Sequence, residues 1–246
     1  ANNALHFYKS SETSITRPSY QFKIDNPTFL SDAKTFSHLE ISSKDSLSLQ
    51  LNALKIYQKL IYLHIKKANK NALALIDIKR LNFINLHAII NQKENTLVST
   101  LKASKEQNKN HEATGLYAFE IAKAYKVQSK NKEAIRICDL IIKSFPKSFG
   151  AKKCTILKNQ IEQKTLSIKT EEYIPIDKNS RLLVTYKNVK KLFFTAYNIS
   201  QKQQEELYKI YKFEDKKAFI YKLNKAKTWK HQLRNEHDYL QHTTEV

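Results

Sequence analysis

The sequence predicts an α+β protein in which a helical, repeat-like region at positions 1–164 precedes a shorter β-rich module at 165–246. Three observations support this division. Between about position 45 and position 163, apolar residues recur every three or four positions, which is typical of amphipathic helices. Beyond Thr165, runs of β-branched and aromatic residues indicate strands. The sequence contains only two Gly and four Pro, which suits helices joined by short polar connections.

The N-terminal part combines an extended segment with three long helices. Pro18 and Pro27 disfavour helix at the residues that precede them. The alternation of Tyr20, Phe22 and Ile24 with polar residues predicts a strand-like run with one buried face. The helical pattern then predicts helices from about Asp45 to beyond His64, over 73–92 and over 94–105.

The stretch 114–164 places small and apolar residues at spacings that let two helices approach closely, and a proline follows the second helix. The positions that carry this pattern are Ile121, Ala122, Tyr125, Ala134 and Pro146. The pattern resembles the tetratricopeptide repeat, in which antiparallel helix pairs stack on one another. A further helix over 148–163 is expected to pack back on the helix at 134–145.

The C-terminal module shows three strand-like segments, then a charged helical insertion at about 201–225, and one last strand. The segments are LSIKTEEYI, RLLVTYKNV, KLFFTAYNI and the terminal HDYLQHTTEV. Three or four strands do not complete a β-sandwich. We therefore expect the module to be incomplete at Val246 and the chain to be a segment of a longer protein.

The formal net charge is +20, from 43 Lys and Arg against 23 Asp and Glu. Such a balance is typical of nucleic-acid-binding proteins. Here, however, the excess is mostly Lys and is spread along the chain, with Arg at only five positions. Arg is the residue that reads guanine edges and binds phosphates with two parallel hydrogen bonds. Nucleic-acid binding is therefore kept as an alternative.

The sequence contains no run of about 18 apolar residues, so it predicts no membrane helix.

Several segments together resemble the N-terminal part of large bacterial alpha-2-macroglobulin-like proteins. They are ITRPSYQFKIDNP, ALKIYQKLIYLHIK, AIRICDLIIKSFPKSFGAKKCTILKNQIEQKTLSI, LLVTYKNVKKLFFTAYNI and DYLQHTTEV. In this family a helical region precedes a series of macroglobulin-type β-sandwich domains, and the whole protein traps proteases. The resemblance implies a secreted or surface-anchored protein, located in the periplasm or at the cell surface, with any membrane anchor outside this segment.

The expected function is that of a non-catalytic scaffold or interaction segment of such a protein. Its expected partners are proteins: other domains of the parent chain, proteases or envelope proteins. The alternatives are a free-standing tetratricopeptide-type adaptor that binds peptides, and a basic nucleic-acid-binding protein. No Ser-His-Asp order or Gly-rich phosphate loop rises above chance, and no HExxH motif is present, so we expect no enzyme activity, no cofactor and no metal site.

Cys138 and Cys154 are the candidate site residues. Each lies eight positions from Pro146, one before and one after it, so a helix hairpin that turns near Pro146 brings them to the same level. A disulfide requires Cα atoms about 4.4–6.8 Å apart, which tight helix packing can supply. The alternative is two buried thiols that pack as small apolar groups. The extracytoplasmic setting that the resemblance implies favours the disulfide. Neither Cys lies in a thioester-type loop.

Overall fold

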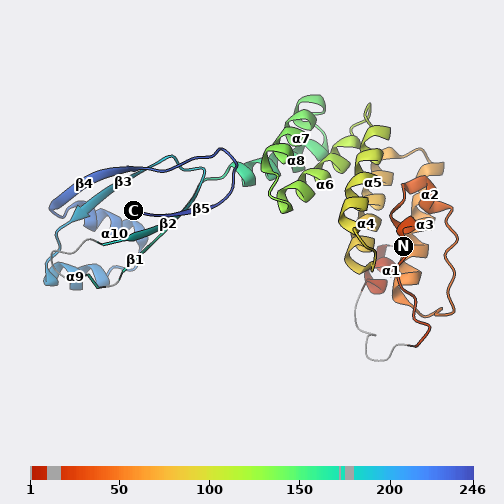
Figure 1. The fold of residues 1–246 in the computed structure, drawn as a ribbon, viewed down its shortest axis with the longest axis horizontal. Helices are drawn as coiled ribbons and strands as arrows, with labels where there is room; N and C mark the ends of the chain where they lie inside the picture. The colour runs from red at the N-terminus through yellow and green to blue at the C-terminus, as the bar shows by residue number, and fades with distance from the viewer. Residues whose placement is uncertain (1, 10–17, 172, 175–179) are drawn as a thin grey trace. The chain divides into compact units, whose positions relative to one another are not determined.

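The computed structural model describes residues 2–9, 18–171, 173–174 and 180–246. These residues form an α+β structure with ten α-helices and two small antiparallel sheets, which confirms the predicted fold class at this level. The chain divides into two compact units, Ala1–Ile161 and Glu162–Val246. In Figure 1 the first unit carries the helices α1–α8 and the second carries all the strands.

Polar N-caps set where several helices of the first unit begin. Asp32, Ser48 and Asn69 each accept a hydrogen bond from a backbone N–H of the turn that follows, which satisfies a donor that a helix start leaves unpaired. Because Asn69 caps the second long helix, that helix begins three residues earlier than the expected 73–92. The elements are α1 (Asn2–Tyr8), η1 (Pro27–Leu30), α2 (Ala33–Ser37), α3 (Leu49–Lys66), α4 (Lys70–His87), α5 (Lys93–Gln107), α6 (Thr114–Val127), α7 (Asn131–Ser144) and α8 (Phe149–Glu162).

Helix α4 lies at the centre of this unit. Its buried residues cover more than half of the circumference of the helix: Ala74, Ile76, Asp77, Ile78, Arg80, Leu81, Phe83 and Ile84. A helix that is buried over so wide an arc must be covered by several neighbours, and α4 contacts α3, α5, α6 and η1. Two of its buried residues are charged, and the apolar periodicity of the sequence did not predict them.

The segment before η1 corrects the expected strand at positions 20–24. Phe22 and Ile24 are buried as the alternation predicts, but no regular strand forms because the backbone pairs with single partners from two separate connecting segments. The Phe22 N–H donates to Asp45 Oδ2 at 3.0 Å, and the Ile24 carbonyl accepts from the Ile89 N–H at 2.8 Å. The segment is therefore bound to the helices by side-chain burial and isolated hydrogen bonds.

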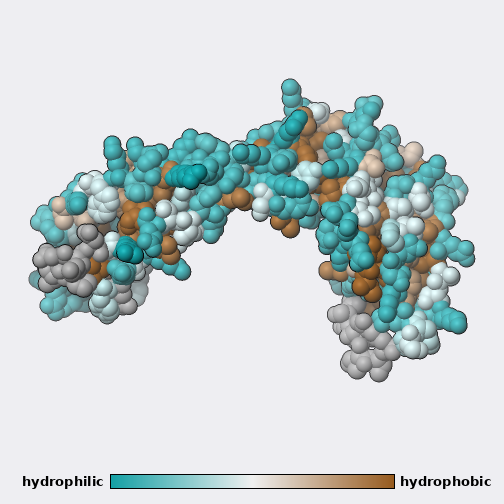
Figure 2. All heavy atoms as spheres, viewed as in Figure 1, coloured by the Kyte–Doolittle hydropathy of each residue, from teal (hydrophilic) through white to brown (hydrophobic). Residues whose placement is uncertain are grey.

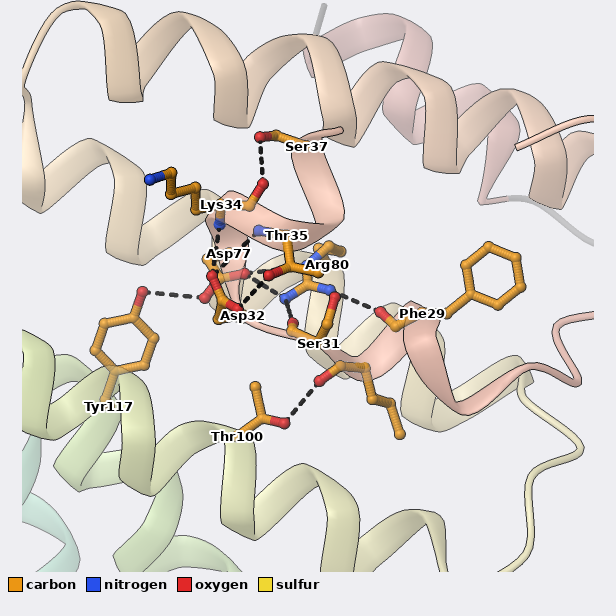
Figure 3. Close-up of polar contacts among 11 residues, drawn as sticks. Phe29, Ser31, Asp32, Lys34, Thr35, Ser37, Asp77, Arg80, Thr100 and Tyr117 are labelled. Atoms are coloured by element: carbon orange, nitrogen blue, oxygen red, sulfur yellow. Dashed lines mark hydrogen bonds and ion pairs between the residues drawn. The ribbon is translucent and has the colours of Figure 1, made fainter. Parts of the chain in front are cut away.

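Arg80 holds η1 and the residue that follows it against α4 (Figure 3). Its guanidinium donates to the carbonyl of Phe29 at 2.7 Å and to that of Ser31 at 2.8 Å. Between them, the carbonyl of Leu30 accepts from Thr100 Oγ1 on α5 at 2.6 Å. Three consecutive carbonyls are thus bound by the helical unit, while the ring of Phe36 lies 4.3 Å from the guanidinium carbon.

Asp77 neutralises this buried cation and links it to α6. Its Oδ1 accepts from Arg80 Nε at 3.0 Å and from Nη2 at 2.6 Å, and its Oδ2 accepts from the Tyr117 hydroxyl at 3.0 Å. Burial, together with the Asp77 carboxylate, raises the pKa of Tyr117, so its hydroxyl stays a donor at neutral pH. Because an unpaired buried charge is costly, this arrangement fixes η1, α4 and α6 relative to one another.

The second unit contains two antiparallel sheets, ordered β1-β2-β5 and β3-β4. Its core is small: Val184 and Tyr186 of β2, Leu192 of β3 and Leu233 after β4 are the buried residues of one cluster. The Tyr186 hydroxyl donates to the Arg234 carbonyl at 2.8 Å, which links β2 to the chain that leaves β4. The strands are β1 (Thr165–Thr170), β2 (Leu182–Lys187), β3 (Lys191–Tyr197), β4 (Lys225–Gln232) and β5 (His242–Glu245).

The expected insertion at 201–225 is two short helices, α9 (Gln201–Tyr208) and α10 (Phe213–Tyr221). Sequence reasoning missed β4, whose segment KAKTWKHQ lacks the alternation of a strand with one buried face. Its pairing with β3 decides its conformation, since Trp229 lies opposite Phe194 and stacks on it with ring centroids 5.0 Å apart.

Two ion pairs of equal length provide a matched test of the buried charge. Arg80–Asp77 and Lys158–Asp139 both measure 2.6 Å, but the first is fully buried and the second is partly exposed. We predict that Asp77→Ala lowers the free energy of unfolding by about 3–5 kcal/mol, because it leaves Arg80 buried without its counter-ion. Asp139→Ala, the control, should cost about 1 kcal/mol or less. Urea titration followed by circular dichroism measures both, and equal losses would contradict the role given to Asp77.

Candidate functional site

The two glycines of the chain meet each other where α6 crosses α8. A Cβ atom added at Gly150 would lie 2.5 Å from the carbonyl carbon of Gly115. One added at Gly115 would lie 3.2 Å from the Gly150 Cα and 2.9 Å from Cγ2 of Ile141 on α7. Neither glycine adopts a positive φ. Both are therefore required for space, because they let two helix backbones touch.

Contacts along the two helices show that α6 and α8 run side by side in the same direction. Gly115 meets Gly150 at the start, and Phe119 lies next to Lys153, whose Nζ is 4.2 Å from the ring centroid. Near the end, Lys126 Nζ lies 3.4 Å from Gln160 Oε1. The partners advance together along both helices, so α6 and α8 present a joint surface.

This surface, the α6–α8 face, combines apolar and basic side chains at helical spacing. Phe149 and Ile156 are 61% and 59% exposed, and because they lie two turns apart on one side of α8 they form an apolar pair on its surface. On the same side of α8, Lys153 lies about one turn from each of them and Gln160 lies one turn beyond Ile156. The face consists of Phe119, Lys123 and Lys126 on α6 with Phe149, Lys153, Ile156 and Gln160 on α8.

Glu120 organises the cations of the face. Its carboxylate is almost fully buried, with 8% of the side chain exposed. Oε2 lies 2.9 Å from Lys123 Nζ and Oε1 lies 3.8 Å from Lys153 Nζ. The Lys153 ammonium also approaches the rings of Phe119 and Phe149, at 4.2 and 5.8 Å from their centroids, where the ring electrons attract it. The arrangement can bind an anionic or apolar group, and it contains no acid–base pair in a cleft.

The candidate disulfide residues lie together on the other side of α8. Cys138 of α7 and Cys154 of α8 are both buried and are present as free thiols, with a hydrogen bond between them. That hydrogen bond, together with burial, raises the pKa of the Cys154 thiol. The same hydrogen bond lowers the pKa of the Cys138 thiol, so Cys138 is the more readily ionised and more nucleophilic member of the pair. The disulfide itself stays a prediction.

The other residues that the sequence singled out have mainly packing roles. Ile121, Ala122 and Ala134 are buried, and Tyr125 is half-buried, with the ammonium groups of Lys102 and Lys130 5.5 and 5.8 Å from its ring centroid. Pro146 is exposed just beyond the end of α7. In β3, Leu192 is buried, whereas Phe193 is 76% exposed.

Sequence reasoning missed the α6–α8 face. The two glycines were treated only as a measure of composition, although they are 35 residues apart, close to the repeat period of about 34 residues of tetratricopeptide repeats. That spacing was the available signal, because equivalent positions in successive repeats lie beside each other. Nothing in the sequence distinguishes Glu120 as the buried carboxylate.

Searches for related proteins leave the chain without a match among family models, curated proteins or solved structures. Within the described parts of the chain, no three His, Cys, Asp or Glu side chains are grouped so that they could hold a metal ion. The described helices include none that is both long and apolar enough to cross a membrane.

The disulfide prediction can be tested by mass and by melting. Bridge formation between Cys138 and Cys154 removes two hydrogens, so oxidised protein should be about 2 Da lighter than reduced protein. The bridge would close a loop of about 15 residues, which chain-entropy estimates value at roughly 3 kcal/mol. The melting temperature of the oxidised protein should therefore fall on reduction, while that of the Cys138→Ala variant should not respond to reductant. Protein prepared without reductant that retains two titratable thiols would contradict the bridge.

Proposed function

We propose that this chain is a non-catalytic scaffold and interaction segment of a larger extracytoplasmic bacterial protein of the alpha-2-macroglobulin-like, protease-trapping kind. The observation that carries the proposal is the parallel contact of α6 and α8 through Gly115 and Gly150. It creates a joint surface from two helices that are separated by α7 in the sequence. Such surfaces, built from alternate helices, are what helical repeat proteins use to bind partners.

The contacts among the five consecutive helices from α4 to α8 support a tetratricopeptide-like arrangement. Helix α4 contacts both α5 and α6, α5 contacts α6, and α6 contacts α7, while α8 touches α6 at the glycines and α7 at Lys158–Asp139. Each of these helices therefore meets the next one, and the alternate helices α4, α6 and α8 also meet in turn, as in stacked helix pairs. The burial of Ile121, Ala122 and Ala134 fits the same arrangement.

The second unit supports the proposal that it is part of a macroglobulin-type β-sandwich. Side chains from both sheets meet in one cluster, as they do between the sheets of a sandwich. This cluster has only four buried members, and many large apolar side chains of the unit stay exposed, among them Phe193, Tyr208, Tyr211 and Phe213. Apolar surface of this kind is usually covered by another part of the protein or by a partner, so we propose that further chain completes the unit.

A free-standing tetratricopeptide-type adaptor is the second candidate function. The observation that favours it is the binding of three consecutive carbonyls, at 29–31, by Arg80 and Thr100. These contacts recognise backbone rather than side chains, as a helical layer that binds a short peptide turn such as η1 would. Here the bound peptide belongs to the same chain, which favours a structural role for this part of the layer and leaves the α6–α8 face for partners.

The scaffold proposal predicts that the purified chain neither hydrolyses peptide substrates nor inhibits proteases. The physical reason is that the bait segment and capture chemistry of the resembled family lie outside these residues. Trypsin, elastase and subtilisin, each incubated with excess chain and assayed on a macromolecular substrate, should keep their full activity. Stoichiometric inhibition that survives removal of the chain's own cleavage products would show that trapping resides in this segment.

A further inference from the structure

We propose that the α6–α8 face binds a protein segment that carries both acidic and apolar side chains. This inference rests on the proposed scaffold function and specifies its partner. The chemistry follows from three properties of the face: exposed apolar side chains, uncompensated basic charge, and lysines that are held in place before any partner arrives.

The apolar property comes mainly from α8. Phe149 and Ile156 lie two turns apart on one side of the helix, and each exposes well over half of its surface. Figure 2 shows a mainly hydrophilic surface on the helical unit, with apolar side chains gathered in small areas. Apolar residues placed two turns apart offer separate positions for the side chains of a bound segment.

The basic property comes from both helices. The segments 114–127 and 149–160 of these helices contain five Lys and no Arg. Glu120 is the single carboxylate in the segments 114–127 and 149–160 that build the face. It forms ion pairs with two lysines, Lys123 and Lys153. Lys126, whose recorded partner on the face is the neutral Gln160, adds a third cation. The face therefore keeps a positive charge that acidic side chains of a partner would complement.

The lysines are also pre-organised. Glu120 and the rings of Phe119 and Phe149 fix the Lys153 ammonium, and Glu120 fixes that of Lys123. An ammonium carries three donors, so each can bind a partner carboxylate while it retains Glu120. Since these side chains are ordered beforehand, binding costs less conformational entropy than binding to free surface lysines would.

The same geometry favours a protein segment over a nucleic acid. Single-stranded nucleic acids stack their bases on open aromatic faces, but here the Lys153 ammonium lies over the Phe119 ring. The face contains no Arg, the residue that binds phosphates with a planar pair of donors. Phe149 alone offers an exposed ring. An acidic and apolar peptide uses all three properties of the face, whereas an oligonucleotide uses only its charge.

The test is a fluorescence anisotropy titration of the full chain with labelled synthetic peptides. The probe is a peptide that alternates Glu with Leu and Phe, and its comparison is the same peptide with Lys in place of every Glu. We expect saturable binding of the first and at least about tenfold weaker binding of the second. A labelled oligouridylate is titrated in parallel.

Matched variants locate the site. Ile156→Ser removes an apolar contact of the face, and Leu140→Ser, on α7, is its control because Leu140 is 55% exposed. The double variant Lys123→Ala/Lys126→Ala removes two charges from the face, and Lys143→Ala/Lys147→Ala removes two exposed charges outside it. Each face variant should weaken probe binding by about tenfold, and each control by less than about twofold. Melting curves identify any variant that no longer folds. If one face variant does not fold, probe binding by the other face variant tests the location of the site.

The possible results separate this inference from the scaffold proposal. If the probe does not bind, or if controls and face variants weaken it equally, the partner chemistry is wrong, although the chain can still be an inert scaffold. Oligouridylate binding that exceeds probe binding and is lost in the face variants would replace the protein partner with a nucleic acid. Protease inhibition by the chain alone would overturn the scaffold function, whatever the probe does.

Discussion

The contact between Gly115 and Gly150 is the constraint on which the functional surface depends. A side chain as small as a methyl group at Gly150 would place its Cβ 2.5 Å from the Gly115 carbonyl carbon, so only glycine lets the two helices lie this close. The close approach brings Lys153 within reach of Glu120 and Phe119. A chain with only two glycines in 246 residues thus uses both at a single crossing.

A different kind of constraint operates deeper in the helical unit. There, Arg80 and Asp77 are fully buried and hydrogen-bond to η1, to each other and to Tyr117. Well-packed apolar residues can replace such a pair with little loss of stability, whereas removal of one partner is costly. The pair therefore specifies where the N-terminal segment binds rather than supplying most of the stability. Together, the two constraints position α6 from both sides, through Tyr117 toward α4 and through Gly115 toward α8.

The sequence predicted those features that depend on periodic burial. It predicted the long helices, the strands β1, β2, β3 and β5, and the change of character at Thr165, because apolar spacing reports local structure. It did not predict β4, whose conformation depends on the stacking of Trp229 on Phe194, or the irregular path at 20–24, which single hydrogen bonds to distant elements fix. The candidate face was missed for the same reason. Glu120 and Lys153 become partners only when two helices that are separated in sequence lie side by side.

The most direct test of this account is the effect of Gly150→Ala on the free energy of unfolding. In a helix without close neighbours, this substitution stabilises by up to about 1 kcal/mol, because alanine has the higher helix propensity. The account predicts the opposite sign: a loss of about 1–3 kcal/mol from overpacking against the Gly115 backbone, while Lys152→Ala at an exposed position of α8 changes little. A Gly150→Ala protein that is as stable as the parent or more stable would contradict the close approach of α6 and α8.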